Sequence, residues 1–156
     1  AATTRGLAEV GTPLLAFLDA DDLWLPHKAQ RQIEDLAANP ARDGFCALGR
    51  QFRDGTVPTD HDKVQEIWSR SALMIRTENA RAVGPVIDPP GRRGDMIDWF
   101  ARARAASLDI AMLPEVLVLR RIRPDSLSYG RGARDIGYLH VAKAALDRRR
   151  ARGDAT

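Results

Sequence analysis

The most constraining feature of the sequence is an apolar run that leads directly into a cluster of acidic residues. Residues 13–18 read Pro-Leu-Leu-Ala-Phe-Leu, and Asp19, Ala20, Asp21 and Asp22 follow them. A short continuous apolar run predicts a buried strand, and open α/β sheets bind their ligands beyond the carboxyl ends of their strands. The sequence therefore predicts a ligand site directly after this strand.

The carboxylates of this cluster suit a divalent cation. Carboxylate oxygens are preferred ligands of Mg²⁺ and Mn²⁺, and such an ion usually shares its coordination shell between one or two carboxylates and substrate phosphates. Three acids within four residues also repel one another, and a cation would offset that repulsion. The alternative is an acidic turn in which Asp22 caps the helix that follows.

The remainder of the sequence alternates between helix and strand patterns. Pro26 suits the first residue of a helix that stops near residues 39–40, with Ala29, Ile33, Leu36 and Ala37 on its apolar face. Further helices are expected at 4–10, 78–83, 95–107 and 133–151, and strands at 45–52 and 71–76. The segments 110–113 and 116–122 are expected to be two strands, or one strand with a break at Pro114. This alternation predicts one α/β domain.

Composition narrows the class of protein further. A chain of 156 residues with 44% apolar and 29% charged residues is expected to form one soluble domain. No apolar run approaches the roughly 20 residues of a membrane-spanning helix, and the first residues lack a signal-peptide pattern. The single cysteine excludes an internal disulfide. A cytoplasmic location and no transmembrane segment are expected.

Charge is distributed unevenly along the sequence. Residues 1–91 hold 10 basic and 13 acidic residues, whereas residues 92–156 hold 14 basic and 8 acidic residues, so positive charge gathers in the second part. Such a part can attract phosphates or nucleic acid, although the arginines at 148–152 also suit the solvated end of a helix. Because no basic motif with interleaved aromatic residues accompanies them, no nucleic-acid partner is expected.

A long string around the acidic cluster resembles a known enzyme family. From Arg5 to Lys28 the sequence is similar to the middle of family 2 glycosyltransferases, in which a small-residue helix and a glycine precede an apolar strand, Asp-Ala-Asp-Asp, an aromatic residue, a proline and a lysine. Residues 71–84, 94–102 and 114–128 resemble later segments of the same family. The resemblance covers about residues 1–128.

The resemblance implies a fold and an activity. It implies a GT-A-type α/β fold with a mixed sheet flanked by helices. It also implies transfer of a sugar from a nucleotide-diphospho-sugar to an acceptor hydroxyl, with inversion at the anomeric carbon. Asp19 and Asp21 would hold Mn²⁺ or Mg²⁺, and contacts to the donor are assigned to Asp19, Asp22, Arg121 and Arg123. The acceptor is not indicated.

Two further acids are candidates for the catalytic base. The family resemblance points to the acidic helix start at 94–102, where Asp95 and Asp98 are three residues apart and so share one face of a helix. A helix start favours an ionised carboxylate, which a base requires. The alternative is that Asp95 is an N-cap and Asp98 a first-turn residue; Asp95 is the first choice for the base.

Three arginines in the last segment that resembles the family are candidates for binding the donor diphosphate. Arg120, Arg121 and Arg123 follow one another closely, and a guanidinium grips phosphate oxygens with two hydrogen bonds. The alternative is a solvent-facing strand edge.

Several positions depart from the family pattern. No segment corresponds to the first strands of the family, which bind the nucleotide base, so a partial GT-A fold lacking its N-terminal nucleotide-binding strands is expected. Thr4 stands where the family usually has an asparagine, and Met96 stands where its second base-motif acid falls. Arg123 replaces the histidine of an Arg-x-His motif, and an arginine cannot ligate a cation.

These departures define the expected organisation and the alternatives. Residues 1–130 are expected to form the C-terminal portion of a glycosyltransferase domain, and 131–156 a basic helix and tail. Exposed strand edges of a partial domain predict self-association. The first alternative is a non-catalytic remnant or interaction module that keeps part of the fold. The second is a haloacid-dehalogenase-like phosphatase, which also places Asp-x-Asp after a strand.

Overall fold

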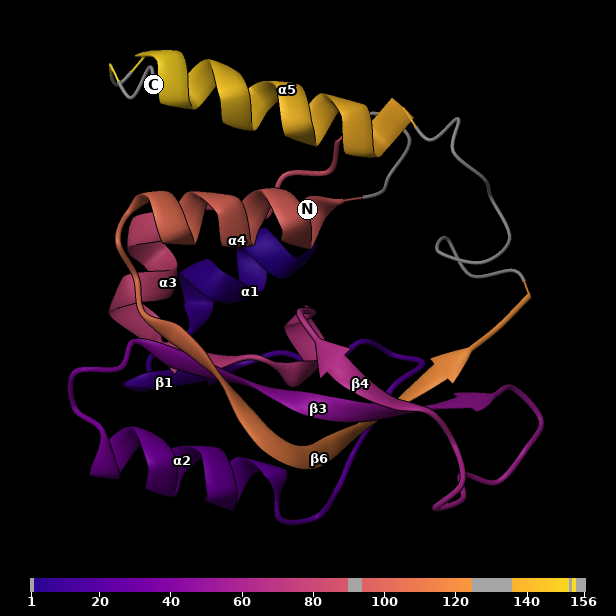
Figure 1. Ribbon diagram of the computed structural model, residues 1–156. Helices are drawn as coiled ribbons and strands as arrows, with labels where there is room; N and C mark the ends of the chain where they lie inside the picture. The colour runs from indigo at the N-terminus through magenta and orange to yellow at the C-terminus, as the bar shows by residue number, and fades with distance from the viewer. Residues whose placement is uncertain (1, 90–93, 125–135, 152, 154–156) are drawn as a thin grey trace.

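The computed structural model describes residues 2–89, 94–124, 136–151 and 153, and these form one mixed sheet with helices on both faces (Figure 1). Five strands follow the order β1-β5-β3-β6-β2, and a sixth, β4, pairs with β3. The strands are β1 (Leu14–Ala16), β2 (Leu23–Trp24), β3 (Gly44–Arg53), β4 (Val64–Ile67), β5 (Met74–Arg76) and β6 (Ile110–Ile122). The predicted α/β class and the mixed sheet are confirmed.

The long central pair of the sheet is β3 and β6, which run parallel. Their register extends from Gly44 opposite Ile110 to Arg53 opposite Ile122. It shifts twice on β6, between Leu113 and Val116 and again between Val116 and Val118. Proline has no N–H to donate to a ladder, and the predicted alternative of one strand with a break at Pro114 is confirmed. The other neighbouring pairs of the sheet are antiparallel.

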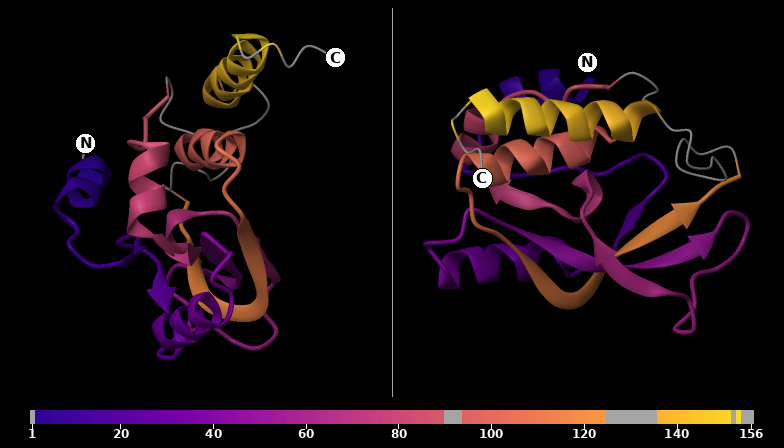
Figure 2. Two further views of the ribbon diagram at one scale, coloured as in Figure 1. Left: turned by 90° about the vertical axis from the view of Figure 1, so that its left-hand side faces the viewer. Right: turned by 45° about the horizontal axis from the view of Figure 1, so that its top comes forward.

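Helices cover both faces of this sheet. Helix α2 (Lys28–Ala38) lies on one face; α1 (Ala2–Glu9), α3 (Thr77–Val83) and α4 (Asp95–Ala105) lie on the other, and α5 (Ile136–Ala151) lies beyond α4 (Figures 1 and 2). A short 3₁₀ turn, η1 (Arg70–Ala72), connects β4 to β5. The predicted helices are confirmed within these bounds. The predicted start of the last helix at 133 and the domain boundary at 130 lie outside the described residues.

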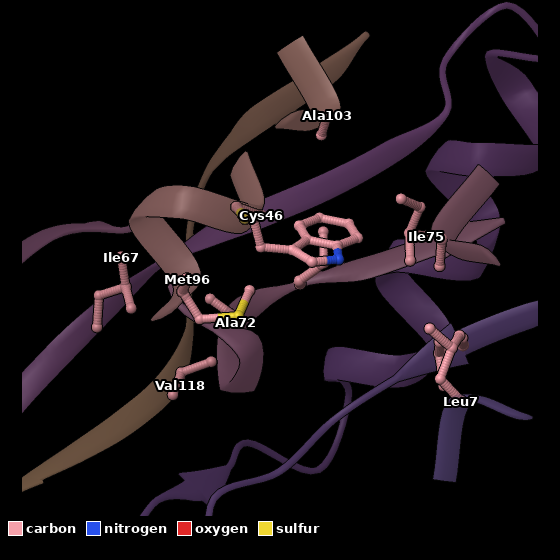
Figure 3. Packing of buried hydrophobic residues seen from close by; sticks show 12 residues of the cluster. Leu7, Cys46, Ile67, Ala72, Ile75, Met96, Ala103 and Val118 are labelled. Atoms are coloured by element: carbon pink, nitrogen blue, oxygen red, sulfur yellow. The ribbon is translucent and has the colours of Figure 1, made fainter. Parts of the chain in front are cut away.

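The core consists of two apolar clusters, one on each face of the sheet. The larger cluster contains Trp99 and Ala103 of α4, with Cys46 and Val118 from the sheet and Leu7 from α1 (Figure 3). The smaller one lies under α2 and contains Leu36, Phe45, Ala47, Met74, Leu113 and Leu117. Trp99 is only 2% exposed, so it is a core residue. No helix in the described part of the chain is long and apolar enough to cross a membrane.

The first strand is shorter than predicted. β1 covers only Leu14–Ala16, Leu15 is its one buried residue, and Leu18 is 50% exposed. The chain leaves the sheet here because the backbone N–H of Asp19 donates a hydrogen bond to Ser71 Oγ of η1 (3.1 Å) instead of to a strand. The prediction of a buried strand over 13–18 was therefore only partly correct.

The buried face of α2 also differs from the prediction. The helix begins at Lys28, after Pro26 and His27, and its buried residues are Lys28, Gln32 and Leu36, whereas Ile33 is 47% exposed. Gln32 Nε2 donates hydrogen bonds to the carbonyl oxygens of β3 and η1, at Phe45 and Ala72 (both 2.9 Å). Because these bonds satisfy the amide, a polar side chain occupies a core position.

Close packing between β3, β4 and β6 predicts a measurable effect at Gly49. A Cβ at this position would lie 2.0 Å from Ile67 Cδ1 and 3.3 Å from the carbonyl oxygen of Val118. Ile67 is buried and cannot move aside freely, so Gly49→Ala is expected to lower the free energy of unfolding by about 1–3 kcal/mol. Urea unfolding measures this change, with Gly11→Ala as the control because nothing lies near its added Cβ. Equal losses in the two variants would contradict the expectation.

Candidate functional site

The acidic loop predicted as a ligand site lies against η1. Asp19 is fixed by its N–H bond to Ser71 Oγ, and the N–H of Asp22 donates to the carbonyl oxygen of Asp19 (3.1 Å), which closes a turn. On the far side of this loop, Trp24 Nε1 donates to the carbonyl oxygen of Ser71 (2.8 Å). The loop is thus attached to Ser71 at both ends, although the two segments are about 50 residues apart in sequence.

Arg70 joins the acidic loop to the start of α4. Its Nε lies 3.3 Å from Asp19 Oδ1, and its Nη2 donates a hydrogen bond to Asp95 Oδ2. Its Nη1 donates to Thr3 Oγ1 of α1 (3.0 Å). Two of the acids predicted from sequence, one in the loop and one on the helix, are therefore brought to the same arginine.

Asp95 is the first residue of α4 and not its cap. The N-cap is Gly94, whose φ of 87° lies in the left-handed region that favours glycine. This turn places Asp95 at the sheet side of the helix start, beside Arg70, with its side chain 20% exposed. The N-cap alternative for Asp95 is thus wrong.

Asp98 lies in a different environment from Asp95. It is 6% exposed, its Oδ2 accepts a hydrogen bond from Arg102 Nε (2.9 Å), and its Oδ1 accepts one from Arg148 Nη2 of α5 (2.7 Å). These contacts connect α4 to α5. The structure does not bring Asp98 to Arg70, so the two candidates for the base are separated.

Asp22 and Arg121 form a second contact between the acidic loop and the sheet. Asp22 is 8% exposed, and its Oδ1 accepts a hydrogen bond from the N–H of Arg121 (3.3 Å). Arg121 Nε donates to the carbonyl oxygen of Asp21 (3.2 Å), its Nη1 donates to Asp54 (2.9 Å), and its guanidinium lies 5.0 Å from the centre of the Phe52 ring. Asp22 therefore supports the loop from inside rather than capping a helix.

A hollow opens beside this contact. It is lined by Ala20, Asp21, Asp54, Arg121 and Arg123 and has a volume of about 530 Å³. The lining carries two carboxylates and two guanidinium groups, which suits a ligand with both phosphate and hydroxyl groups. Arg121 and Arg123, predicted as donor contacts, are thus on the same hollow as Asp21.

Burial changes the acidity of the loop carboxyls. Desolvation raises the pKa of Asp19; the Arg70 guanidinium opposes this, while the charges of Asp21 and Asp95 add to it. Desolvation also raises the pKa of Asp22, against a hydrogen bond from Ser71. A cation near Asp19 would favour its charged form, because it adds an opposite charge.

The carboxylates fit a divalent cation only if the substrate completes its coordination shell. Within the described residues, no group of three or more His, Cys, Asp or Glu side chains could hold a metal ion. Asp19 and Asp21 offer hard oxygen ligands, and Mg²⁺ is commonly held by one or two carboxylates together with phosphates. The residues are therefore consistent with an ion shared with a diphosphate, with Arg123 contributing no ligand.

Sequence reasoning missed Arg70, Ser71 and Asp54. Ser71 falls in the strand predicted at 71–76, Arg70 lies just before it and Asp54 lies just after the strand predicted at 45–52, and the partners of all three are distant in sequence. Each contacts a predicted site residue: Arg70 contacts Asp19 and Asp95, Ser71 accepts a hydrogen bond from the N–H of Asp19, and Asp54 accepts one from Arg121. No local pattern distinguishes these three positions, so only the fold identifies them.

The fold is similar to that of a glycosyltransferase domain. The structure matches a crystal structure of S. aureus TarS 1-349 in complex with UDP, a GT-A-like glycosyltransferase, with a TM-score of 0.58 and 12% sequence identity. The match covers 78% of this chain and 39% of the TarS chain, so this chain corresponds to a part of that structure. No family model matches the sequence, and no curated protein matches it.

Proposed function

We propose that this chain is the acceptor-side portion of a family 2-like glycosyltransferase, which transfers a sugar from a nucleotide-diphospho-sugar to an acceptor hydroxyl with inversion. The observation that carries the proposal is the bridge from Asp19 through Arg70 to Asp95. This bridge brings Asp19, a proposed ligand of the cation that would bind the donor phosphates, and Asp95, a candidate base, into one site on a glycosyltransferase-like fold. The UDP bound to TarS supports a nucleotide-sugar as the donor class. A haloacid-dehalogenase-like phosphatase has no such support.

The base is assigned to Asp95. A base must reach the acceptor hydroxyl and take its proton as the new glycosidic bond forms. Asp95 is partly exposed at the site, whereas both oxygens of the buried Asp98 are occupied by Arg102 and Arg148. Arg70 holds one oxygen of Asp95, which limits the rotation of the carboxylate. Inversion requires this carboxylate and the leaving diphosphate to lie on opposite faces of the sugar.

The departing diphosphate is assigned to the other half of the site. Asp19 and Asp21 would hold Mn²⁺ or Mg²⁺, which stabilises negative charge on the leaving phosphates when bound. Arg121 and Arg123 line the hollow next to Asp21, and their guanidinium groups can each bind two phosphate oxygens. Asp54 and Phe52 hold Arg121 in one orientation. The positive charge of its guanidinium is therefore in position before the reaction begins.

A calorimetric titration tests this assignment. The chain is titrated with UDP, GDP and dTDP with and without Mn²⁺, alongside Asp21→Ala. Binding is expected to require Mn²⁺ and to weaken at least about tenfold in Asp21→Ala, because one of two protein ligands is lost. Asp147→Ala is the matched control, since it removes one exposed carboxylate on α5. The preferred nucleotide identifies the donor class.

Two results would contradict the proposal. Binding that is independent of both Mn²⁺ and Asp21 would mean that the acidic loop does not hold the donor. No nucleotide binding by a folded protein would favour the alternative of a non-catalytic module that retains part of the fold.

A further inference from the structure

The guanidinium of Arg70 is engaged on three sides. Nε faces Asp19, Nη2 donates to Asp95, and Nη1 donates to Thr3. The side chain is 25% exposed, and it begins η1, the turn whose next residue, Ser71, fixes the acidic loop. An arginine held in this way is an internal part of the site and not a mobile surface group, because its guanidinium donates two hydrogen bonds and forms an ion pair with a third residue.

Arg70 stands among carboxylates that repel one another. Asp21 and Asp95 both act unfavourably on a charge at Asp19, and Arg70 is the cation that counteracts them. A divalent cation at Asp19 and Asp21 would serve the same purpose with twice the charge. The guanidinium pairs with Asp19, and a bound cation would interact with the same carboxylate.

We propose that Arg70 is the internal counterion of the acidic site and that a divalent cation must compete with it for Asp19. The inference rests on the proposed function, which supplies the cation site. In the absence of nucleotide, Arg70 keeps Asp19 and Asp95 in place and cation affinity low. With donor phosphates as the remaining ligands, Asp19 would hold a divalent cation in place of the guanidinium, and Arg70 would keep its contact with Asp95.

A resident counterion also affects the order in which the cation and the donor bind. A site with a resident counterion does not hold a cation tightly before the donor binds, so cation and donor binding are coupled. Removal of the guanidinium is expected to uncouple them, because the empty site then carries uncompensated negative charge. The change to be measured is therefore in the nucleotide-free protein.

Arg70→Gln tests the proposal through Mn²⁺ binding without nucleotide. Free Mn²⁺ is measured by electron paramagnetic resonance during titration of the wild-type chain and the variant. We expect Arg70→Gln to bind Mn²⁺ about fivefold more tightly, the size of effect expected for removal of one partly exposed ion pair. Arg70→Lys keeps the charge and is expected to bind as the wild type does. Arg70→Met serves as a second neutral variant if the glutamine variant does not fold.

Arg104→Gln is the matched control, because it removes one exposed positive charge from the same helix that carries Asp95. An equal gain in Arg104→Gln would show a general charge effect and overturn the proposal. Unchanged or weaker Mn²⁺ binding in both neutral variants would overturn it too, as would no Mn²⁺ binding in any folded variant. A gain specific to Arg70, combined with no nucleotide binding, would support the counterion while rejecting the proposed transferase.

Discussion

Asp95→Asn is expected to lower kcat for sugar transfer by about 10²–10⁴-fold, the usual contribution of a positioned general base. Asparagine has nearly the same shape, and its oxygen can still accept the hydrogen bond from Arg70, so the site remains assembled. What is lost is the ability to take a proton from the acceptor. Mn²⁺-dependent nucleotide binding is expected to stay close to that of the wild type, since the proposed role of Asp95 is in proton removal from the acceptor and not in binding the donor.

Steady-state release of the nucleoside diphosphate measures this effect, at saturating donor and with an acceptor found by screening. Added formate is a further readout, because renewed glycosylation of the acceptor itself, and not release of the diphosphate alone, would indicate a missing proton acceptor. A loss of nucleotide binding that matches the loss of transfer would show instead that Asp95 supports the donor, and the assignment of the base would be wrong.

Asp98→Asn is the matched control for this prediction. Asp98 is buried between Arg102 and Arg148, and the amide would leave two guanidinium groups without their carboxylate. The variant is therefore expected to lose about 1–3 kcal/mol of stability, the cost of leaving buried groups imperfectly paired, and to keep most of its transfer activity once folded. Normal melting together with a large loss of transfer would move the role of base from Asp95 to Asp98.

Much of the fold follows from local patterns in the sequence. The strand β3, the helix α4 and the strand β6 with its proline are each recognisable from residues close together in the chain. The acidic loop was also recognisable, because it combines a strand-like run with an Asp cluster. These features depend on period and composition, which a sequence displays directly.

The interior of the site could not be predicted in the same way. Arg70 acts through Asp19 and Asp95, and its hydrogen-bonding partner on α4 is 25 residues away. Lys28 and Gln32 look like surface residues of an amphipathic helix, yet both are buried. Their burial depends on acceptors provided by other segments, so it is a property of the tertiary arrangement and not of the helix itself.

The buried Lys28 lies behind the acidic loop and bears directly on stability. Its Nζ donates a hydrogen bond to Gln32 Oε1 (2.6 Å) and lies 4.1 Å from the centre of the Trp24 ring. Its side chain is 0% exposed, and burial lowers its pKa from 10.5 to about 8. Burial raises the pKa of the neighbouring Cys46 thiol from 9.0 to about 12. Both shifts have the same cause: the charged form of each group is poorly solvated in the core.

These shifts predict an unusual dependence of stability on pH. Below pH 8, Lys28 is charged in the folded and unfolded states, and the folded state bears the full cost of its desolvation. Above pH 8 the folded protein releases this proton before the unfolded chain does, so the unfolded state binds more protons and the free energy of unfolding rises. The rise is about 1.4 kcal/mol per pH unit while only this group titrates. Cys46 acts in the opposite direction above pH 9, where the thiol of the unfolded chain loses its proton first.

We therefore expect the free energy of unfolding to increase between pH 8 and 9 and then to level off, as measured by urea unfolding at constant ionic strength. Lys28→Met removes the titrating group, so its stability is expected to stay level over this interval and to fall above pH 9. Cys46→Ala removes the opposing group, so its stability is expected to continue rising toward pH 10. If the wild type and Lys28→Met show the same pH dependence, Lys28 remains charged in the folded protein, and its contacts with Gln32 and the Trp24 ring must then compensate fully for its burial.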